Sequence, residues 1–246
     1  MPISSRLILD EFDARILGKP VFKLHIHDGA IDLAELKQEM DAVSHPTMIC
    51  CFAPHQTKLL SFLQEENFRL ITTRNTYRKT ISNEAEAYVI PDGMHAIGKG
   101  DPGLAGPGTG YDDLLAEIVP KSRFSKDPMI PAAQALEAYR QWLANSLWDG
   151  FADECFVVDT GGRHAGLITL KVRESSGFID LVVVNREFQG KRIGKVLLSL
   201  AEKYMAGRGI TVMKVETEGE NIQSNAFYQR NAFVLEKFEL IFHRHF

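Results

Sequence analysis

Before residue 82, apolar and polar positions alternate between the period of a strand and the period of a helix. Strict alternation over residues 21–26 predicts a half-exposed strand, and the apolar run over 48–52 predicts a buried one. Asp32 is placed to cap the helix that follows it. In order, the predicted elements are a strand at 21–26, a helix at 33–43, a strand at 48–52, a helix at 55–66 and a strand at 68–71.

After residue 110 the pattern changes to helices followed by closely spaced strands. Leu136, Leu143 and Leu147 form one stripe of a long helix, and the Gly161-Gly162 turn joins two strands as antiparallel neighbours. The predicted elements are helices at 111–119 and 132–147 around a loop at 121–128, strands at 154–159, 165–172 and 178–184, a helix at 195–205, a strand at 211–217, a helix at 223–230 and a strand at 233–242. The fold class is therefore α/β, with a mixed sheet of the α+β kind.

Glycines and prolines crowd between residues 90 and 111. Such a stretch is typical of a linker, and a lid over a site is the alternative. We therefore divide the chain into an N-terminal domain at 1–88, a linker at 89–110 and a C-terminal domain at 111–246.

Composition and net charge limit the classes of partner that the chain is expected to bind. The chain has 246 residues and a net charge of −4, which disfavours nucleic acid, and no stretch approaches the roughly 20 apolar residues of a membrane span. Its three cysteines lack metal-ligand spacing and indicate buried thiols in a reducing, cytoplasmic compartment. The histidines are scattered, so we expect no metal site, and His243 and His245 are expected on the solvent face of the last strand. The oligomeric state is left open, and a homodimer is compatible with the sequence.

Two short segments resemble each other. Residues 62–70 and 227–235 both run from the end of a predicted helix into a strand that begins near a Phe. The two halves are therefore interpreted as copies of one supersecondary unit, with chance similarity as the alternative. The chemistry is not repeated, because Leu63 stands where the later copy has Tyr228.

The turn that follows the apolar strand at 178–184 is the first candidate site. It reads Gln189-Gly190-Lys191-Arg192-Ile193-Gly194 and leads through Lys195 into a helix. The start of a helix offers free N–H groups and a positive dipole end to an anion, and two basic residues add charge there. The hypothesis is a phosphate or pyrophosphate site. The alternative is an ordinary strand–helix connection with solvated basic side chains.

Downstream residues favour the phosphate hypothesis. Gln189-x-x-Arg192-x-Gly194 followed by Asn221-x-x-Ser224-x-x-x-Tyr228-x-x-x-Ala232-Phe233 resembles the two motifs of the GNAT superfamily of N-acetyltransferases. The resemblance implies a GNAT fold in the C-terminal domain, with a degenerate GNAT-like half before it. Arg192, Ser224 and Ala232 depart from the family pattern. The arginine in place of a glycine indicates that this position does not need a positive φ.

The resemblance also implies roles for individual residues. Residues 189–195 would hold the pyrophosphate of acetyl-coenzyme A, and backbone groups near Val182 and Val184 would face its pantetheine and thioester. Tyr228 would protonate the leaving sulfur as general acid; a core aromatic is the alternative, but the neighbouring Phe227 suits the core better. Asn221 would position the cofactor or a water, against the alternative of a helix cap.

A narrower resemblance covers most of the chain. Ser122-Arg123-Phe124, Tyr139-x-x-Trp142 and 154–158 resemble the two-domain GNAT enzymes that acetylate TDP-4-amino-4,6-dideoxygalactose. Arg123, in a loop before a helix, is a candidate bidentate ligand for the substrate's phosphates, with a surface arginine as the alternative. Tyr139 and Trp142, three residues apart on one helix, are candidates to face one substrate pocket, although core packing is the expected role of Trp142.

Two carboxylates are candidates for the general base that would take the proton of the amine. Asp180 and Glu216 lie within or at the end of apolar strands, where a carboxylate is unusual, although each is equally read as a paired structural charge. A third alternative is that there is no dedicated base, because the amine of an amino sugar is less basic than that of lysine. The expected function is acetyl-coenzyme A-dependent N-acetylation of a small amine, with a nucleotide-linked 4-amino-sugar as first choice. The alternatives are an amino-acid, polyamine or peptide acetyltransferase, and a non-catalytic module that binds acyl-coenzyme A.

Overall fold

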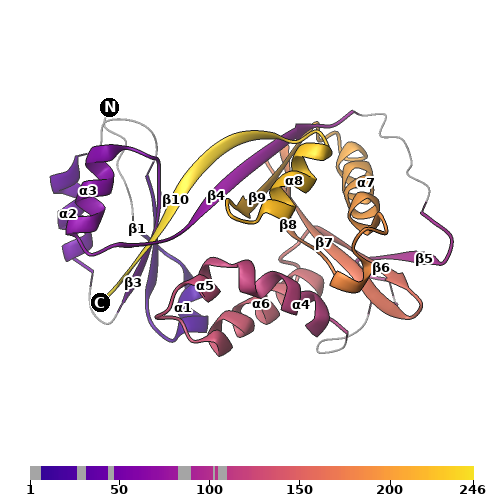
Figure 1. Cartoon of the computed structure of the whole chain (residues 1–246), viewed down its shortest axis with the longest axis horizontal. Helices are drawn as coiled ribbons and strands as arrows, with labels where there is room; N and C mark the ends of the chain where they lie inside the picture. The colour runs from indigo at the N-terminus through magenta and orange to yellow at the C-terminus, as the bar shows by residue number, and fades with distance from the viewer. Residues whose placement is uncertain (1–6, 27–31, 44–46, 83–89, 102, 105–109) are drawn as a thin grey trace.

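The computed structural model describes residues 7–26, 32–43, 47–82, 90–101, 103–104 and 110–246, and the strands in these ranges form one mixed sheet (Figure 1). The strands are β1 (Leu7–Leu9), β2 (Val21–His25), β3 (Met48–Ala53), β4 (Arg69–Thr80), β5 (Met94–Gly98), β6 (Glu154–Thr160), β7 (Arg163–Arg173), β8 (Ser176–Val184), β9 (Val212–Glu218) and β10 (Val234–His245). The helices are α1 (Glu11–Leu17), α2 (Leu33–Asp41), α3 (Thr57–Glu65), α4 (Asp112–Ile118), α5 (Arg123–Lys126), α6 (Ala132–Leu147), α7 (Ile193–Ala206) and α8 (Ile222–Arg230), with 3₁₀ turns at Val119–Lys121 and Arg186–Phe188.

In the strand order, each half of the chain contributes one strand to the other half's part of the sheet. The order runs β1-β2-β3-β10-β4-β9-β8-β7-β6-β5, so the last strand lies beside β3 while β4 lies beside β9. Among the described strands, only the pairs β2/β3 and β8/β9 are parallel. In Figure 1, β4 and β10 cross the molecule side by side, from α2 and α3 at one end to α8 at the other.

The structure supports the internal repeat. The alignment of residues 62–70 with 227–235 makes Arg69 equivalent to Val234 and, extended along both strands, Arg78 equivalent to His243. In the β4/β10 ladder Arg78 pairs with Val234, and the equivalent pair, Arg69 with His243, occurs there too. The same alignment relates Asn67 to Ala232, which have φ values of 61° and 64°. The two helix-to-strand corners thus share one backbone conformation, and each half gives its last strand to the other.

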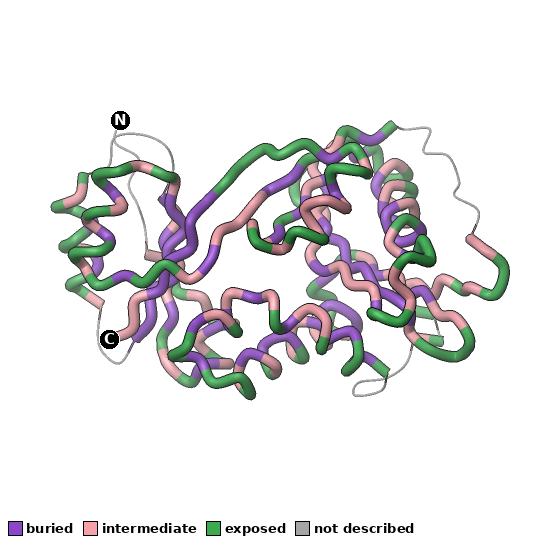
Figure 2. The backbone as a smooth tube through the Cα atoms, viewed as in Figure 1, coloured by how far each residue is buried: buried purple, intermediate pink, exposed green. Residues whose placement is uncertain are grey.

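Three apolar clusters hold the sheet between its helices. α1, α4 and α6 pack on one face over both halves of the chain. α2 and α3 cover the opposite face of the N-terminal half, and α7 and α8 cover that of the C-terminal half. Figure 2 shows the buried residues gathered on the strands beneath these helices, whereas the first part of β10 is exposed. Among the described residues, no helix is long and apolar enough to cross a membrane.

The mixed α/β class is confirmed, and four local predictions need correction. Within the expected linker, Met94–Gly98 form β5, which pairs with β6 at the edge of the sheet. The expected loop at 121–128 contains α5, which begins at a Ser122 cap. β4 continues well beyond residue 71 because both of its neighbours extend with it. His243 and His245 do not face solvent, because the loop containing Asp127 covers that side of β10. The lid alternative falls partly on residues 105–109, outside the described residues.

Candidate active site

The site begins where two parallel strands separate. β8 and β9 pair with each other from Ser176–Val212 to Ile179–Val215. Beyond that point β8 continues to Val184 and β9 to Glu218, but the two strands no longer pair with each other. A β-bulge at Asp180 accompanies the separation, since Leu170 pairs with Ile179 and Thr169 with Leu181. Unpaired backbone groups along the splayed strands are then available to a ligand.

A cavity of about 430 Å³ lies beside the splayed end of β8. Its wall is built by β8, the turn before α7, α8 and α4. It includes nearly all of the residues predicted to bind the cofactor, together with the predicted acid: Val182, Val184, Gln189, Gly190, Arg192, Ile193, Gly194, Lys195, Asn221 and Tyr228. Lys191 is the predicted member outside this wall; its ammonium lies 5.0 Å from the ring centre of Phe188.

The turn before α7 has the geometry of an anion site, but one prediction about it is wrong. Arg192 has φ of 65° and ψ of 9°, so this position is left-handed although it holds no glycine. Gly190 has φ of 78°. The two positive φ values turn the chain sharply into α7, whose first N–H groups have no partner within the helix. The side chains of Lys191 and Arg192 are exposed beside them.

Two contacts fix this turn against α8. Gln189 donates from Nε2 to the carbonyl of Val184 at 3.1 Å and accepts from Nε2 of Gln223 at 2.8 Å. At Gly194, an added Cβ would lie 3.0 Å from the ring of Phe227. The first turn of α7 therefore approaches α8 closely, so a side chain at Gly194 would require the Phe227 ring to shift.

Tyr228 lies on α8 between the cavity and the core. Its side chain is 3% exposed and packs against Tyr77, Phe227 and Phe233. Burial, and then the nearby carboxylate of Glu218, raise the pKa of its phenol. Tyr228 therefore carries a proton throughout the neutral range, which suits a general acid. Asn221, at the start of α8, both caps the helix by accepting from the N–H of Ser224 at 3.2 Å and lines the cavity.

The two carboxylates predicted as bases are engaged elsewhere. The bulge turns Asp180 toward α6, where it accepts from Nε1 of Trp142 at 2.8 Å and pairs with Lys171 at 3.3 Å. Glu216 is half-exposed and pairs with Arg74 at 3.0 Å. Neither lines the cavity, so the base role of each stays a prediction.

The predicted substrate ligands lie on the α6 side of the sheet. Arg123 is bound to Asp13 of α1, with its guanidinium 4.0 Å from the ring centre of Phe124. It is therefore occupied by an internal partner and does not line the cavity. Tyr139 is buried in α6 beside Trp142, and burial, followed by the nearby carboxylate of Glu218, raises the pKa of its phenol.

Glu218 is the residue that sequence reasoning missed. It ends β9 beyond the last β8/β9 pair, and burial raises the pKa of its carboxyl. It also raises the pKa values of both Tyr139 and Tyr228, so its carboxylate lies near α6 and α8 alike. Within the part of the chain that the structure describes, no lysine or arginine forms an ion pair with it. Because side chains alternate along a strand, Glu216 and Glu218 lie on the same face of β9. Which of the two forms an ion pair depends on the position of Arg74 on β4, and Arg74 pairs with Glu216.

Comparison with known proteins agrees with this geometry. Residues 121–233 match the family described as Acetyltransferase (GNAT) family. A spore coat polysaccharide biosynthesis protein, SpsD, from Bacillus subtilis is 28% identical over 132 residues, which are 53% of this chain and 45% of that protein. The chain thus spans less than half the length of this curated relative.

Two solved structures share the fold over nearly the whole chain. A GCN5-related N-acetyltransferase from Sphaerobacter thermophilus superposes with a TM-score of 0.61 at 13% identity, covering 98% of this chain and 76% of that one. A tandem GNAT protein from the clavulanic acid biosynthesis pathway gives a TM-score of 0.56 at 13% identity, covering 93% and 76%. The GNAT fold is therefore confirmed, and the repeat is consistent with a tandem architecture.

Substitutions at Arg192 test the left-handed turn. Arg192→Gly should leave the free energy of unfolding unchanged or raise it by up to ~1 kcal/mol, because glycine adopts a positive φ without a Cβ clash. Arg192→Val should lower it by about 1–2 kcal/mol, since a β-branched residue is strained there. Urea unfolding measures both. Equal stability of the two variants would contradict a left-handed conformation at this position.

Proposed function

We propose that residues 121–233, which match the Acetyltransferase (GNAT) family, form a domain that transfers the acetyl group of acetyl-coenzyme A to the primary amine of a nucleotide-linked 4-amino-sugar. The observation that supports it most is the joining of the basic turn at 189–195 and Tyr228 on one cavity wall. A sugar acceptor is suggested by the polysaccharide biosynthesis named for the Bacillus relative and by the resemblance of residues 122–124 and 139–142 to amino-sugar acetyltransferases.

The residues of the cavity suit acetyl-coenzyme A. The N-terminus of α7, with Lys191 and Arg192 beside it, would hold the pyrophosphate. The splayed backbone of β8 near Val182 and Val184, with Phe227 opposite, would hold the pantetheine arm. When bound, acetyl-coenzyme A supplies an activated acetyl thioester.

Two residues of the chain would move the protons. Glu218, which does not itself line the cavity, accepts a proton from the attacking ammonium through water, and its raised pKa brings it nearer to the neutral range where a base works best. The amine nitrogen then forms the new bond to the acetyl carbon while the carbon–sulfur bond breaks. Tyr228 gives its phenolic proton to the departing sulfur, and the second proton lost from the attacking nitrogen returns to the phenolate through water. The products are the acetamide and the free thiol of coenzyme A, with the first proton on Glu218.

A second candidate acceptor is a small amine without a nucleotide. The observation that favours it is the engagement of Arg123 by Asp13, which leaves the proposed phosphate ligand internally paired. Thiol release from acetyl-coenzyme A with TDP-4-amino-4,6-dideoxygalactose, a polyamine and free amino acids separates the two. Turnover with the polyamine or amino acids alone would reject the amino-sugar, and binding of the cofactor without any turnover would favour a non-catalytic module.

Tyr228→Phe removes the acid while keeping the aromatic ring in the core. We expect the kcat to fall roughly 10²–10⁴-fold, with the Kd of coenzyme A nearly unchanged, because the phenol acts only on the departing sulfur. Tyr204→Phe is the matched control, since Tyr204 lies on α7 away from the cavity and packs on Phe156. A large loss of coenzyme A affinity or of folded protein in Tyr228→Phe would show instead that the residue is structural.

Glu218→Gln and Glu216→Gln distinguish the two carboxylates of β9. Glu218→Gln should lower kcat/KM roughly 10²-fold and remove the acid limb of its pH profile, because activity is lost as pH falls through the raised pKa of that base. Glu216→Gln breaks a half-exposed ion pair with Arg74 and should change little. The opposite ranking in a pH series of kcat/KM would assign the base to Glu216.

A further inference from the structure

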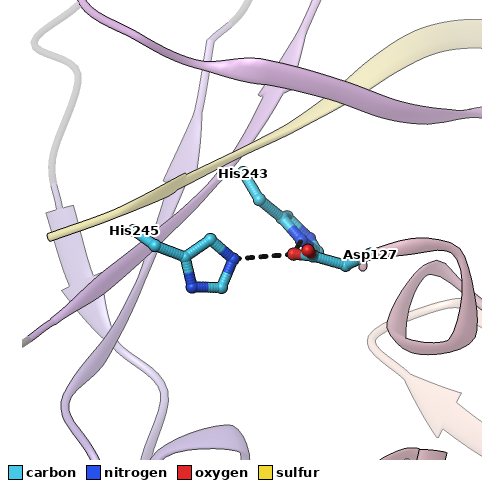
Figure 3. Close-up of side chains that lie close together, drawn as sticks. All are labelled: Asp127, His243 and His245. Carbon is cyan, nitrogen blue, oxygen red and sulfur yellow. Dashed lines mark hydrogen bonds and ion pairs between the residues drawn. The ribbon is translucent and has the colours of Figure 1, made fainter. Parts of the chain in front are cut away.

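Three potential metal ligands converge where the end of β10 meets the loop between α5 and α6 (Figure 3). Oδ2 of Asp127 lies 2.6 Å from Nδ1 of His243 and 2.7 Å from Nε2 of His245. The three ligand atoms lie within 4.8 Å of one another. Both the Asp127 carboxylate and the His243 ring are at most 1% exposed, so this polar group lies inside the protein. None of the three lines the acetyl-transfer cavity.

The chain holds these ligands on ordered elements. His243 and His245 are two residues apart on a strand, so alternation puts both rings on the same face of β10. β10 is paired with β3 and β4 on its two sides at His243. Asp127 is held by the N–H of Met129, which donates to its Oδ1 at 2.9 Å, and by the N–H of Ile130, which donates to its carbonyl at 3.0 Å.

We propose that Asp127, His243 and His245 form a binding site for a zinc ion. Two imidazole nitrogens and one carboxylate oxygen are donors that zinc takes in proteins, with a water completing four-coordination. Bonds of about 2.0–2.1 Å at tetrahedral angles place ligand atoms about 3.3 Å apart. The observed contacts of 2.6 and 2.7 Å need to lengthen by about 0.6–0.7 Å to reach that spacing.

The surroundings supply one supporting contact and one opposing one. The buried Cys50 is the cross-strand neighbour of His243, where its thiol could become an outer partner of a ligating ring, and Nε2 of His243 is buried without a hydrogen-bond partner among the described residues. On the other side, Nζ of Lys19 lies 3.0 Å from Nδ1 of His245. Zinc on Nε2 requires a proton on Nδ1, so the Lys19 ammonium must turn away when the ion binds. Lys19 therefore weakens the site and controls its affinity.

Zinc titration of the full-length, untagged and chelator-stripped protein tests the site. The wild-type protein should bind one zinc ion per chain, bind cobalt(II) with the visible absorption of tetrahedral coordination, and unfold at a higher temperature with zinc than without it. His245→Gln should lose both the binding and the thermal shift. The matched control His55→Gln alters an exposed histidine far along the chain from the cluster and should keep both.

Lys19→Met gives the site a signature that a simple hydrogen-bonded cluster lacks. Removing the ammonium beside His245 should tighten zinc binding, by roughly tenfold if it acts like other outer partners of metal ligands. Circular dichroism shows whether each variant is folded. No saturable binding by the wild-type protein, or binding retained in folded His245→Gln, would overturn the proposal and leave these residues as a hydrogen-bonded clasp between β10 and the α5–α6 loop.

Discussion

The separation of β8 from β9 after the Ile179–Val215 pair is the constraint on which the rest of the site depends. α7 follows β8 and α8 follows β9 in the chain. Because these two strands separate, the two helices begin on opposite sides of a gap. The anion-binding turn and Tyr228 consequently share one cavity although they lie far apart in the sequence. A continuous ladder would have satisfied the same backbone groups internally and left no room for a ligand.

The exchange of β4 and β10 joins the two halves in one sheet, but the two halves differ at the parallel strand pair where the C-terminal half has its cavity. Each half lends its last strand to the other, and Arg74 of β4 ties the exchange together by pairing with Glu239 and Glu216 while lying over Phe52. In the N-terminal copy, β2 stays paired with β3 over its entire length, so no comparable gap opens between these two described strands. Leu63 and Gln56 occupy the places of Tyr228 and Asn221, and Gln56 makes no capping bond from its side chain. That copy thus contributes architecture to the active one.

Local chemistry made much of the site readable from the sequence. The turn at 189–195 and Tyr228 were accessible because glycines, basic residues and an amphipathic helix leave short-range patterns. The prediction that residue 192 needs no positive φ was wrong, because the packing of the turn fixes φ and the conformational preference of arginine is too weak to oppose it. Glu218 and the buried His243 depend on segments that arrive from elsewhere: Arg74 neutralises Glu216 rather than Glu218, and the Asp127 loop covers the end of β10. No spacing along one strand reveals such contacts.

Hydrogen–deuterium exchange with and without acetyl-coenzyme A tests most directly the claim that one cofactor site lies in the C-terminal half. The account predicts slower exchange at residues 182–195 and along α8, with α3, the equivalent helix of the N-terminal copy, unchanged. Slower exchange at α3, or none at the 189–195 turn under saturating acetyl-coenzyme A, would contradict it.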